Sequence, residues 1–283
     1  MEDAISCCNL EKQFDGFSLI LSEFHVQKGT VHGLVGANGS GKTTTLKLLL
    51  GMLSPNTGTI SVLGSEYIGT DISIKQKIGF IIEEASLPSL LNPFEIGKVM
   101  SGIHDRWDAE MYSSLLKDFH LDEKKPFRKC SRGMKIKMQL AIALSHGATL
   151  LILDEPTSSL DPVAREEILD LLGNFAKDEE HTVLISSHIT SDLEKLCDYI
   201  TFLENGRIRI SEEKDNLLQS YRLIRISPNY LEDIEPSTIL GMKRNAFAVE
   251  LLLKTEDVPS FAEANRIDLE TLIIMLAQKG DWS

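Results

Sequence analysis

Residues 36–44 read Gly36-Ala37-Asn38-Gly39-Ser40-Gly41-Lys42-Thr43-Thr44 and follow an apolar run at residues 31–35. A helical pattern begins directly after them, over residues 45–52. A glycine-rich turn between a strand and a helix points backbone N–H groups and the positive end of the helix at an anion. The spacing of the glycines, the lysine and the threonine therefore predicts a phosphate-binding loop.

The residues of this loop have distinct expected contacts with a bound nucleotide. Gly36 and Gly41 leave room for phosphate oxygens. Lys42 reaches the terminal phosphates, and Thr43 offers its hydroxyl group to Mg²⁺. The other expected nucleotide contacts of the loop are Asn38, Gly39, Ser40 and Thr44.

The composition favours a soluble globular protein, since 42% of the 283 residues are hydrophobic and 25% are charged. Apolar runs such as residues 150–153 are far shorter than the roughly 20 residues that span a bilayer. The acidic start, residues 1–4, does not resemble a secretion signal, so we expect a cytoplasmic protein. A formal net charge of −13 opposes nonspecific binding to nucleic acid, which is not an expected partner.

Strand and helix patterns alternate along most of the chain and predict an α/β core, a mostly parallel sheet with helices on both faces. Residues 5–10 and 17–24 alternate apolar and polar side chains, which predicts an antiparallel β subdomain. Helical periodicity at about residues 92–146 predicts an inserted helical subdomain. Further expected strands are residues 59–63, 78–82, 149–153 and 182–186, with helices at residues 162–176 and 191–196 and a hairpin at residues 199–210.

The pattern changes after residue 212 and predicts a small α/β accessory domain over residues 213–283. Strands are expected at residues 221–226 and 247–253, and a closing helix at residues 269–277. No chemical motif lies in this unit, so dimerisation, regulation and stabilisation all remain open. Dimerisation ranks first, because a small apolar unit often needs a partner to bury its face.

An apolar strand at residues 150–153 ends in the carboxylates of Asp154 and Glu155. Asp154 can join the coordination shell of Mg²⁺. Glu155 is not needed as a metal ligand, so its carboxylate can polarise an attacking water. Two acids after a strand are by themselves most often an ordinary strand end. Combined with the phosphate-binding loop, they predict a nucleotide hydrolase.

At this point the chain resembles the nucleotide-binding subunit of ATP-binding-cassette (ABC) transporters. Residues 153–162, Leu-Asp-Glu-Pro-Thr-Ser-Ser-Leu-Asp-Pro, follow that family's order, and the resemblance covers about residues 3–212. It implies that Asp161 couples the two sites of a dimer and that His188 contacts the γ-phosphate of ATP. It also places Phe14 where the family stacks an aromatic ring on adenine, with core packing as the alternative.

Two departures from the family's pattern concern candidate site residues. Residues 130–135, Cys-Ser-Arg-Gly-Met-Lys, occupy the place of the Leu-Ser-Gly-Gly-Gln signature and retain Ser131 and Gly133. Ser131 can bind the γ-phosphate held by an opposite subunit, or it can simply cap its own helix. Glu83 replaces a glutamine that touches Mg²⁺ in most members, and its alternative is a solvated acid after a strand. Together, the two departures resemble the branch of bacitracin- and lantibiotic-type exporter ATPases.

The resemblance implies an ATP-binding and ATP-hydrolysing subunit, with Lys42, Glu155 and His188 as its catalytic residues. Such a subunit acts as a homodimer or a heterodimer and drives a separate transmembrane permease, which would hold it at the inner face of the membrane. The permease would dock near residues 84–103. The apolar contacts expected there are Leu87, Leu90, Leu91 and Phe94, which can equally be core residues of the helical subdomain.

Two other functions compete with an exporter ATPase. One is a soluble ABC ATPase of cofactor assembly, translation or repair, although the chain has neither a second cassette nor a long coiled-coil insertion. The other is a nucleotide-dependent binding module that barely hydrolyses ATP, because its signature is altered.

Overall fold

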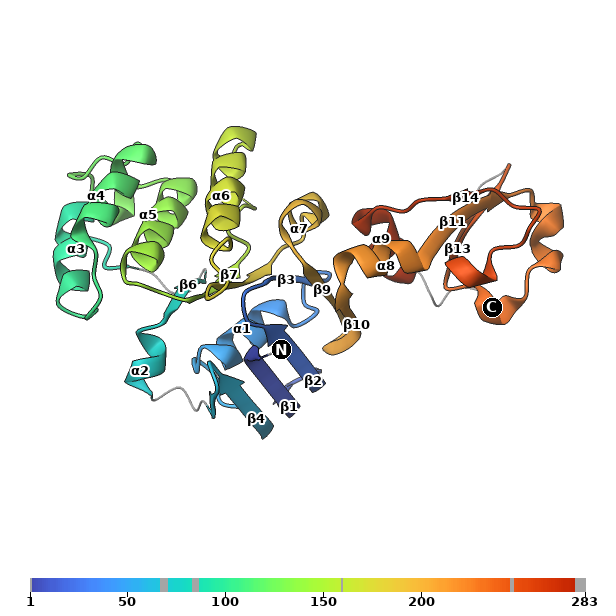
Figure 1. The fold of residues 1–283 in the computed structure, drawn as a ribbon, viewed down its shortest axis with the longest axis horizontal. Helices are drawn as coiled ribbons and strands as arrows, with labels where there is room; N and C mark the ends of the chain where they lie inside the picture. Colours follow the sequence, from blue (N-terminus) through green and yellow to red (C-terminus); the bar gives the residue numbers. More distant parts are fainter. Residues whose placement is uncertain (1, 67–70, 83–86, 159, 245–246, 278–283) are drawn as a thin grey trace.

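The computed structural model describes residues 2–66, 71–82, 87–158, 160–244 and 247–277, whose arrangement is shown in Figure 1. Its centre is a ten-stranded mixed sheet with the strand order β5-β4-β1-β2-β10-β9-β3-β8-β7-β6. The expected α/β class with an antiparallel β subdomain is confirmed.

Five parallel strands in this sheet direct their carboxyl ends to one edge. β9, β3, β8, β7 and β6 pair in that order. All residues of β3, β7 and β8 are buried, which explains why these segments are apolar without alternation. The bounds are β3 Val31–Val35, β6 Ile78–Ile81, β7 Leu150–Asp154, β8 Thr182–Ser186 and β9 Tyr199–Glu204.

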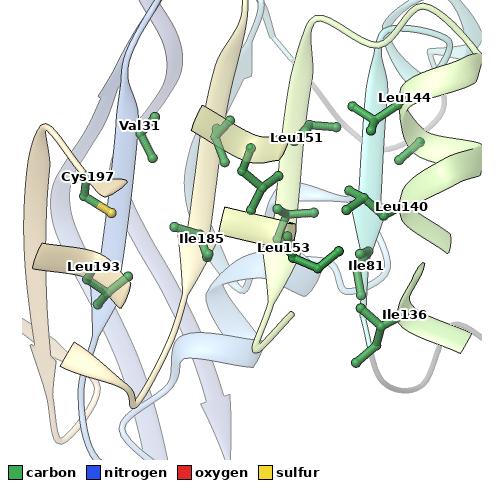
Figure 2. Close-up of a cluster of buried hydrophobic side chains, with 14 of the residues drawn as sticks. Val31, Ile81, Ile136, Leu140, Leu144, Leu151, Leu153, Ile185, Leu193 and Cys197 are labelled. Carbon is green, nitrogen blue, oxygen red and sulfur yellow. The ribbon is translucent and has the colours of Figure 1, made fainter. Parts of the chain in front are cut away.

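Alternate side chains of the parallel strands enter two cores, one on each face of the sheet. Leu151 and Leu153 of β7 join a cluster with α5, α6 and α7, part of which is drawn in Figure 2. Leu150 and Ile152 join a second cluster with α1 and the antiparallel strands. Each of these buried side chains contributes about 1.5–3 kcal/mol, so the strand ends are firmly held. The helix bounds are α1 Lys42–Leu49, α5 Arg132–Ser145, α6 Pro162–Phe175 and α7 Thr190–Leu196.

The antiparallel strands form a wall beside α1. β1 and β2 form a hairpin whose turn places Phe14 opposite Phe17. β9 and β10 form the expected second hairpin, and its turn residues Asn205 and Gly206 both have positive φ, as this turn requires. The bounds are β1 Asp3–Phe14, β2 Phe17–Gln27, β4 Thr57–Val62, β5 Ser65–Glu66 and β10 Arg207–Glu213.

The expected helical block lies at one end of the molecule, beyond β6 (Figure 1). It contains α3 (Pro93–Ser101), α4 (Ala109–Asp118) and α5, with a 3₁₀ turn at Phe127–Lys129, and α2 (Ile72–Lys75) precedes β6. Asn92 forms a capping box with Glu95 at the start of α3, which fixes where the block begins. Within the described ranges, no helix has both the length and the apolarity that crossing a membrane requires.

The C-terminal unit, described at residues 214–244 and 247–277, lies at the opposite end (Figure 1). A four-stranded antiparallel sheet in the order β12-β13-β11-β14 includes both expected strands and two that the sequence patterns missed. The apolar face of α9 belongs to the same core cluster as Leu193 of α7, so the chain itself covers that face. Part of the apolar surface of this unit is therefore buried within the chain, and dimerisation through the unit stays a prediction. The bounds are α8 Lys214–Ser220, β11 Tyr221–Ile226, β12 Gly241–Arg244, β13 Val249–Lys254, β14 Ala264–Asn265 and α9 Leu269–Ala277, with 3₁₀ turns at Pro228–Asp233, Pro236–Thr238 and Thr255–Asp257.

Candidate functional site

The glycine-rich loop joins β3 to α1, as expected. Gly39 and Gly41 have φ values of +81° and +111°, which side-chain-bearing residues rarely adopt. A Cβ on Gly36 would lie 2.2 Å from the carbonyl oxygen of Leu203. No side chain caps the first turn of α1, so its N–H groups face the loop without a side-chain acceptor. This geometry suits an anion such as phosphate.

Lys42 lies inside the loop that precedes it. Its Nζ donates to the carbonyl oxygens of Gly36 (2.7 Å) and Ala37 (3.3 Å), and it lies 4.0 Å from Oε1 of Glu155. Desolvation by burial lowers the pKa of the Lys42 ammonium, and the carboxylates of Glu155 and Asp154 oppose this shift. A buried ammonium held by carbonyl oxygens is well placed to exchange them for phosphate oxygens.

Thr43 and Asp154 meet at the junction of α1 and β7. The hydroxyl of Thr43 donates to Oδ2 of Asp154 at 2.8 Å, and Ser186 of β8 donates to Oδ1 at 2.5 Å. Hydroxyl and carboxylate oxygens are the ligands that Mg²⁺ prefers, and Mg²⁺ in nucleotide sites typically takes one or two protein ligands plus phosphates and water. The pair therefore fits Mg²⁺. Sequence reasoning missed Ser186, although its place at the end of β8 could have indicated it.

Glu155 and His188 form the other half of the site. Oε2 of Glu155 lies 2.6 Å from Nδ1 of His188 and accepts the His188 backbone N–H at 3.3 Å. Glu155 has a φ of +48°, an uncommon conformation for this residue that typically costs about 1–3 kcal/mol. Hydrogen bonds from its N–H to the backbone oxygen (3.1 Å) and hydroxyl (3.2 Å) of Ser186 hold this conformation. A carboxylate fixed in this way can accept a proton from water.

These groups line a single cavity of about 820 Å³. Phe14 and Phe17 form one wall, with their rings 6.3 Å apart, and Phe14 is 44% exposed. The core alternative for Phe14 is therefore wrong, and its stacking on adenine stays a prediction. The sequence analysis did not include Phe17, although its position across the turn from Phe14 could have indicated it. The remaining lining residues are Asn38, Gly39, Gly41, Lys42, Thr43, Thr44, Arg132, Asp154, Glu155, Ser158 and His188.

The signature segment lies mostly outside this cavity. Ser131 caps α5 by accepting the Met134 N–H at 3.2 Å, so its capping role is observed. Gly133 packs so near Leu160 that a Cβ would lie 2.8 Å from the Leu160 Cδ2. Arg132, regarded from sequence only as a departure from the family, lies on the cavity rim, whereas Ser131 and Gly133 do not line it.

Three further expected residues, Gly36, Ser40 and Asp161, do not line the cavity. Asp161 caps α6 by accepting the N–H groups of Ala164 (3.0 Å) and Val163 (3.1 Å), which lower the pKa of its carboxyl group. The side chain of Ser40, within the loop, is buried, and its hydroxyl has no hydrogen-bond partner among the described residues. The predicted metal contact Glu83 lies outside the described residues.

The expected docking residues divide into two kinds. Leu90 and Phe94 are 67% and 54% exposed, whereas Leu87 and Leu91 pack against the core cluster that contains Leu151 and Leu153. Leu87 also lines an apolar groove of about 510 Å³ between the sheet and the helical block. Other lining residues of the groove are Leu50, Gly51, Met52, Lys75, Ile78, Phe80, Met100, Ile103, His104, Gln139, Ile142, Ala143 and His146.

The loop, the Thr43–Asp154 pair and the Glu155–His188 pair define a nucleotide-hydrolysing protein with a phosphate-binding loop. The family model described as "ABC transporter" matches residues 21–158. The chain is 37% identical to the lantibiotic transport ATP-binding protein SrtF of Streptococcus pyogenes over 73% of this chain and 90% of SrtF. It is 33% identical to the bacitracin transport ATP-binding protein BcrA of Enterococcus faecalis, over 74% of this chain and 68% of BcrA.

A solved structure described as the ATP-binding subunit of an ABC transporter superposes with a TM-score of 0.68 at 26% identity. The superposition covers 76% of this chain and 91% of that one. The chain therefore belongs to the ABC transporter family of ATP-binding proteins. It is an ATP-binding and ATP-hydrolysing subunit of a transporter.

Proposed function

We propose that this subunit powers a separate membrane permease that exports a peptide, an antibiotic or another small molecule. The observation that carries its catalytic part is the presence of the Thr43–Asp154 pair and the Glu155–His188 pair in one cavity. The exporter part is supported by the similarity to lantibiotic and bacitracin transport proteins.

The catalytic roles follow from the contacts within the cavity. Lys42 and the loop N–H groups bind the phosphates, and Thr43 and Asp154 hold Mg²⁺. When bound, Mg²⁺ neutralises charge on the phosphates. Glu155 accepts the proton of the attacking water at its carboxylate, while His188 fixes that carboxylate through the 2.6 Å hydrogen bond.

The position of the signature segment supports a dimer. Ser131 and Gly133 do not line the cavity of their own chain, and Ser131 is exposed at the start of α5. The first turn of α5 is thus available to the γ-phosphate of ATP bound by a second subunit. We propose that two such subunits, identical or related, enclose each ATP, and that Asp161 lies near their interface.

The apolar groove between the sheet and the helical block is the proposed permease contact. Ile103 is 55% exposed on its rim, and Phe80 is 39% exposed within it. An amphipathic helix of the permease would bury these side chains, as helices do in hydrophobic grooves. Such a contact would place the subunit at the inner face of the membrane.

The proposal is tested by expressing the tagged Glu155→Gln chain in its own host and identifying what copurifies from detergent-solubilised membranes. A multi-span protein recovered in near-stoichiometric amount is the expected result. Ile103→Asp should abolish that recovery, whereas Phe261→Asp, at an equally exposed residue of the C-terminal unit, should not. Recovery with cytosolic partners alone would contradict the transporter assignment and favour a soluble ABC ATPase.

A further inference from the structure

α7 is a short helix that begins two residues after His188. Its buried Asp192 accepts hydrogen bonds from the Thr157 hydroxyl and from Nε of Arg165, both at 2.6 Å. Thr157 follows Glu155 in the chain by two residues, and Arg165 belongs to α6. One side of α7 is therefore fixed to the segment that carries the proposed catalytic carboxylate.

The other side of α7 is fixed to the C-terminal unit through Glu194. Its Oε2 accepts the backbone N–H of Leu269, the first residue of α9, at 3.2 Å. The backbone oxygen of Glu194 accepts a hydrogen bond from Nζ of Lys214, the first residue of α8, at 2.8 Å. Leu193 packs in the same apolar cluster as Leu269 and Leu272, so a buried apolar contact between α7 and α9 accompanies these hydrogen bonds.

α9 also lies near the phosphate-binding loop. A second cavity, of about 370 Å³, is lined on one side by residues 36–40 and His188. Its other side is lined by Glu270, Ile273, Ile274 and Ala277 of α9. The C-terminal helix and the candidate catalytic histidine thus border the same space.

The Glu194 contact has a clear physical basis. The first N–H groups of a helix have no partner within it, and a carboxylate there is favoured by the helix dipole. Here the carboxylate comes from another helix, so satisfying the start of α9 also fixes α7 in place. A helix this short moves as one body, and a shift of α9 would therefore displace the segment that holds His188.

We propose that Glu194 is a positioning residue for ATP hydrolysis, through which the C-terminal unit holds His188 against Glu155. This inference rests on the proposed roles of Glu155 and His188. It assigns the C-terminal unit a regulatory task, one of the three alternatives that its sequence leaves open. A ligand or partner that moved α9 would change the hydrolysis rate without touching ATP.

The test compares kcat and KM for Mg-ATP in variants of the full chain. Glu194→Ala should lower kcat about tenfold and leave KM nearly unchanged, because a misplaced catalytic group costs rate more than binding. Glu194→Gln, which retains a hydrogen-bond acceptor for the Leu269 N–H, should restore most of the rate. Asp268→Ala is the matched control, since Asp268 caps the same end of α9 by accepting the Thr271 N–H at 2.7 Å but, within the described part of the chain, forms no hydrogen bond to α7.

Equal kcat losses in Glu194→Ala and Asp268→Ala, or no loss in Glu194→Ala, would overturn the inference. The His188→Ala background adds a second check. If Glu194 acts through His188, Glu194→Ala should lower kcat little further in that background, and a full tenfold additional loss would contradict it. Wild-type rates in Glu155→Gln and His188→Ala alone would instead refute the proposed catalytic roles, which separates the two failures.

Discussion

Oε2 of Glu155 accepts a hydrogen bond from the backbone N–H of His188 and lies 2.6 Å from Nδ1 of the same histidine. Both the backbone and the side chain of His188 therefore hold the carboxylate. The positive φ of Glu155 directs its side chain into the cavity lined by the phosphate-binding loop. A strained backbone that the surrounding hydrogen bonds maintain is typical of a functional position. The contact can therefore serve catalysis as well as stability.

Glu155→Gln should lower the ATP hydrolysis rate by about 100-fold or more, because an amide cannot accept the proton of the attacking water. ATP affinity should be preserved, since the loop and the Thr43–Asp154 pair are unchanged. Steady-state hydrolysis and equilibrium binding of Mg-ATP measure the two effects. Glu180→Gln, in a surface ion pair with Lys28, is the control that should leave both unchanged.

The same variant should form a stable dimer with Mg-ATP, because binding continues while hydrolysis stops. Light scattering at saturating Mg-ATP measures its mass. A monomer under these conditions would mean either that the prediction is wrong or that the natural partner is a different cassette subunit.

Lys42→Ala should weaken ATP binding roughly 100-fold, because charge-assisted hydrogen bonds to phosphate contribute about 1.5–3 kcal/mol. Fluorescence titration with a labelled nucleotide measures the change. Lys28→Ala removes a half-buried ammonium that pairs with Glu180 and does not line the cavity, so it should have no effect. Unchanged affinity in Lys42→Ala would exclude the loop as the phosphate-binding element.

The sequence predicted the parallel core and its site because the relevant signals are local. The loop at residues 36–44 and the acids after β7 each follow an apolar strand, and parallel strands bring their carboxyl ends together at one edge. Their proximity in the structure, with Thr43 bonded to Asp154, follows from that topology.

What the sequence could not predict depends on contacts between distant segments. Phe14 can be a core residue or a cavity wall until its exposure is known, and 44% exposure excludes the core. The hydrogen bond from the Ser186 hydroxyl to Asp154 depends on the pairing of β7 with β8. The bond between Glu194 and Leu269 joins residues 75 positions apart, which no periodicity indicates.

Asp154→Asn should raise the Mg²⁺ concentration needed for half-maximal hydrolysis by about tenfold, because a neutral amide is a weaker ligand than a carboxylate. The Ser186 contact can persist, since the amide oxygen still accepts a hydrogen bond. Hydrolysis measured over a Mg²⁺ titration at fixed ATP gives the shift. An unchanged Mg²⁺ dependence would remove Asp154 from the metal site.

His32 should make the folded protein sensitive to acid. Its ring is fully buried between Phe24 and Tyr199, and its Nε2 lies 2.7 Å from the Thr201 hydroxyl. Burial lowers its pKa from 6.5 to about 3. Between these values the unfolded chain binds a proton that the folded chain does not, so the free energy of unfolding falls as the pH falls.

The expected loss due to His32 is about 1.4 kcal/mol per pH unit below pH 6.5, and His32→Gln should remove it because glutamine carries no titratable proton. Urea unfolding at pH 7.5, 6.0 and 5.0 measures the slope for each variant. His25→Gln, at an exposed histidine paired with Asp3, is the control for the substitution itself. Equal slopes in the wild type and His32→Gln would mean that His32 is not held neutral in the fold, since only a difference in proton uptake between the two states produces this dependence on pH.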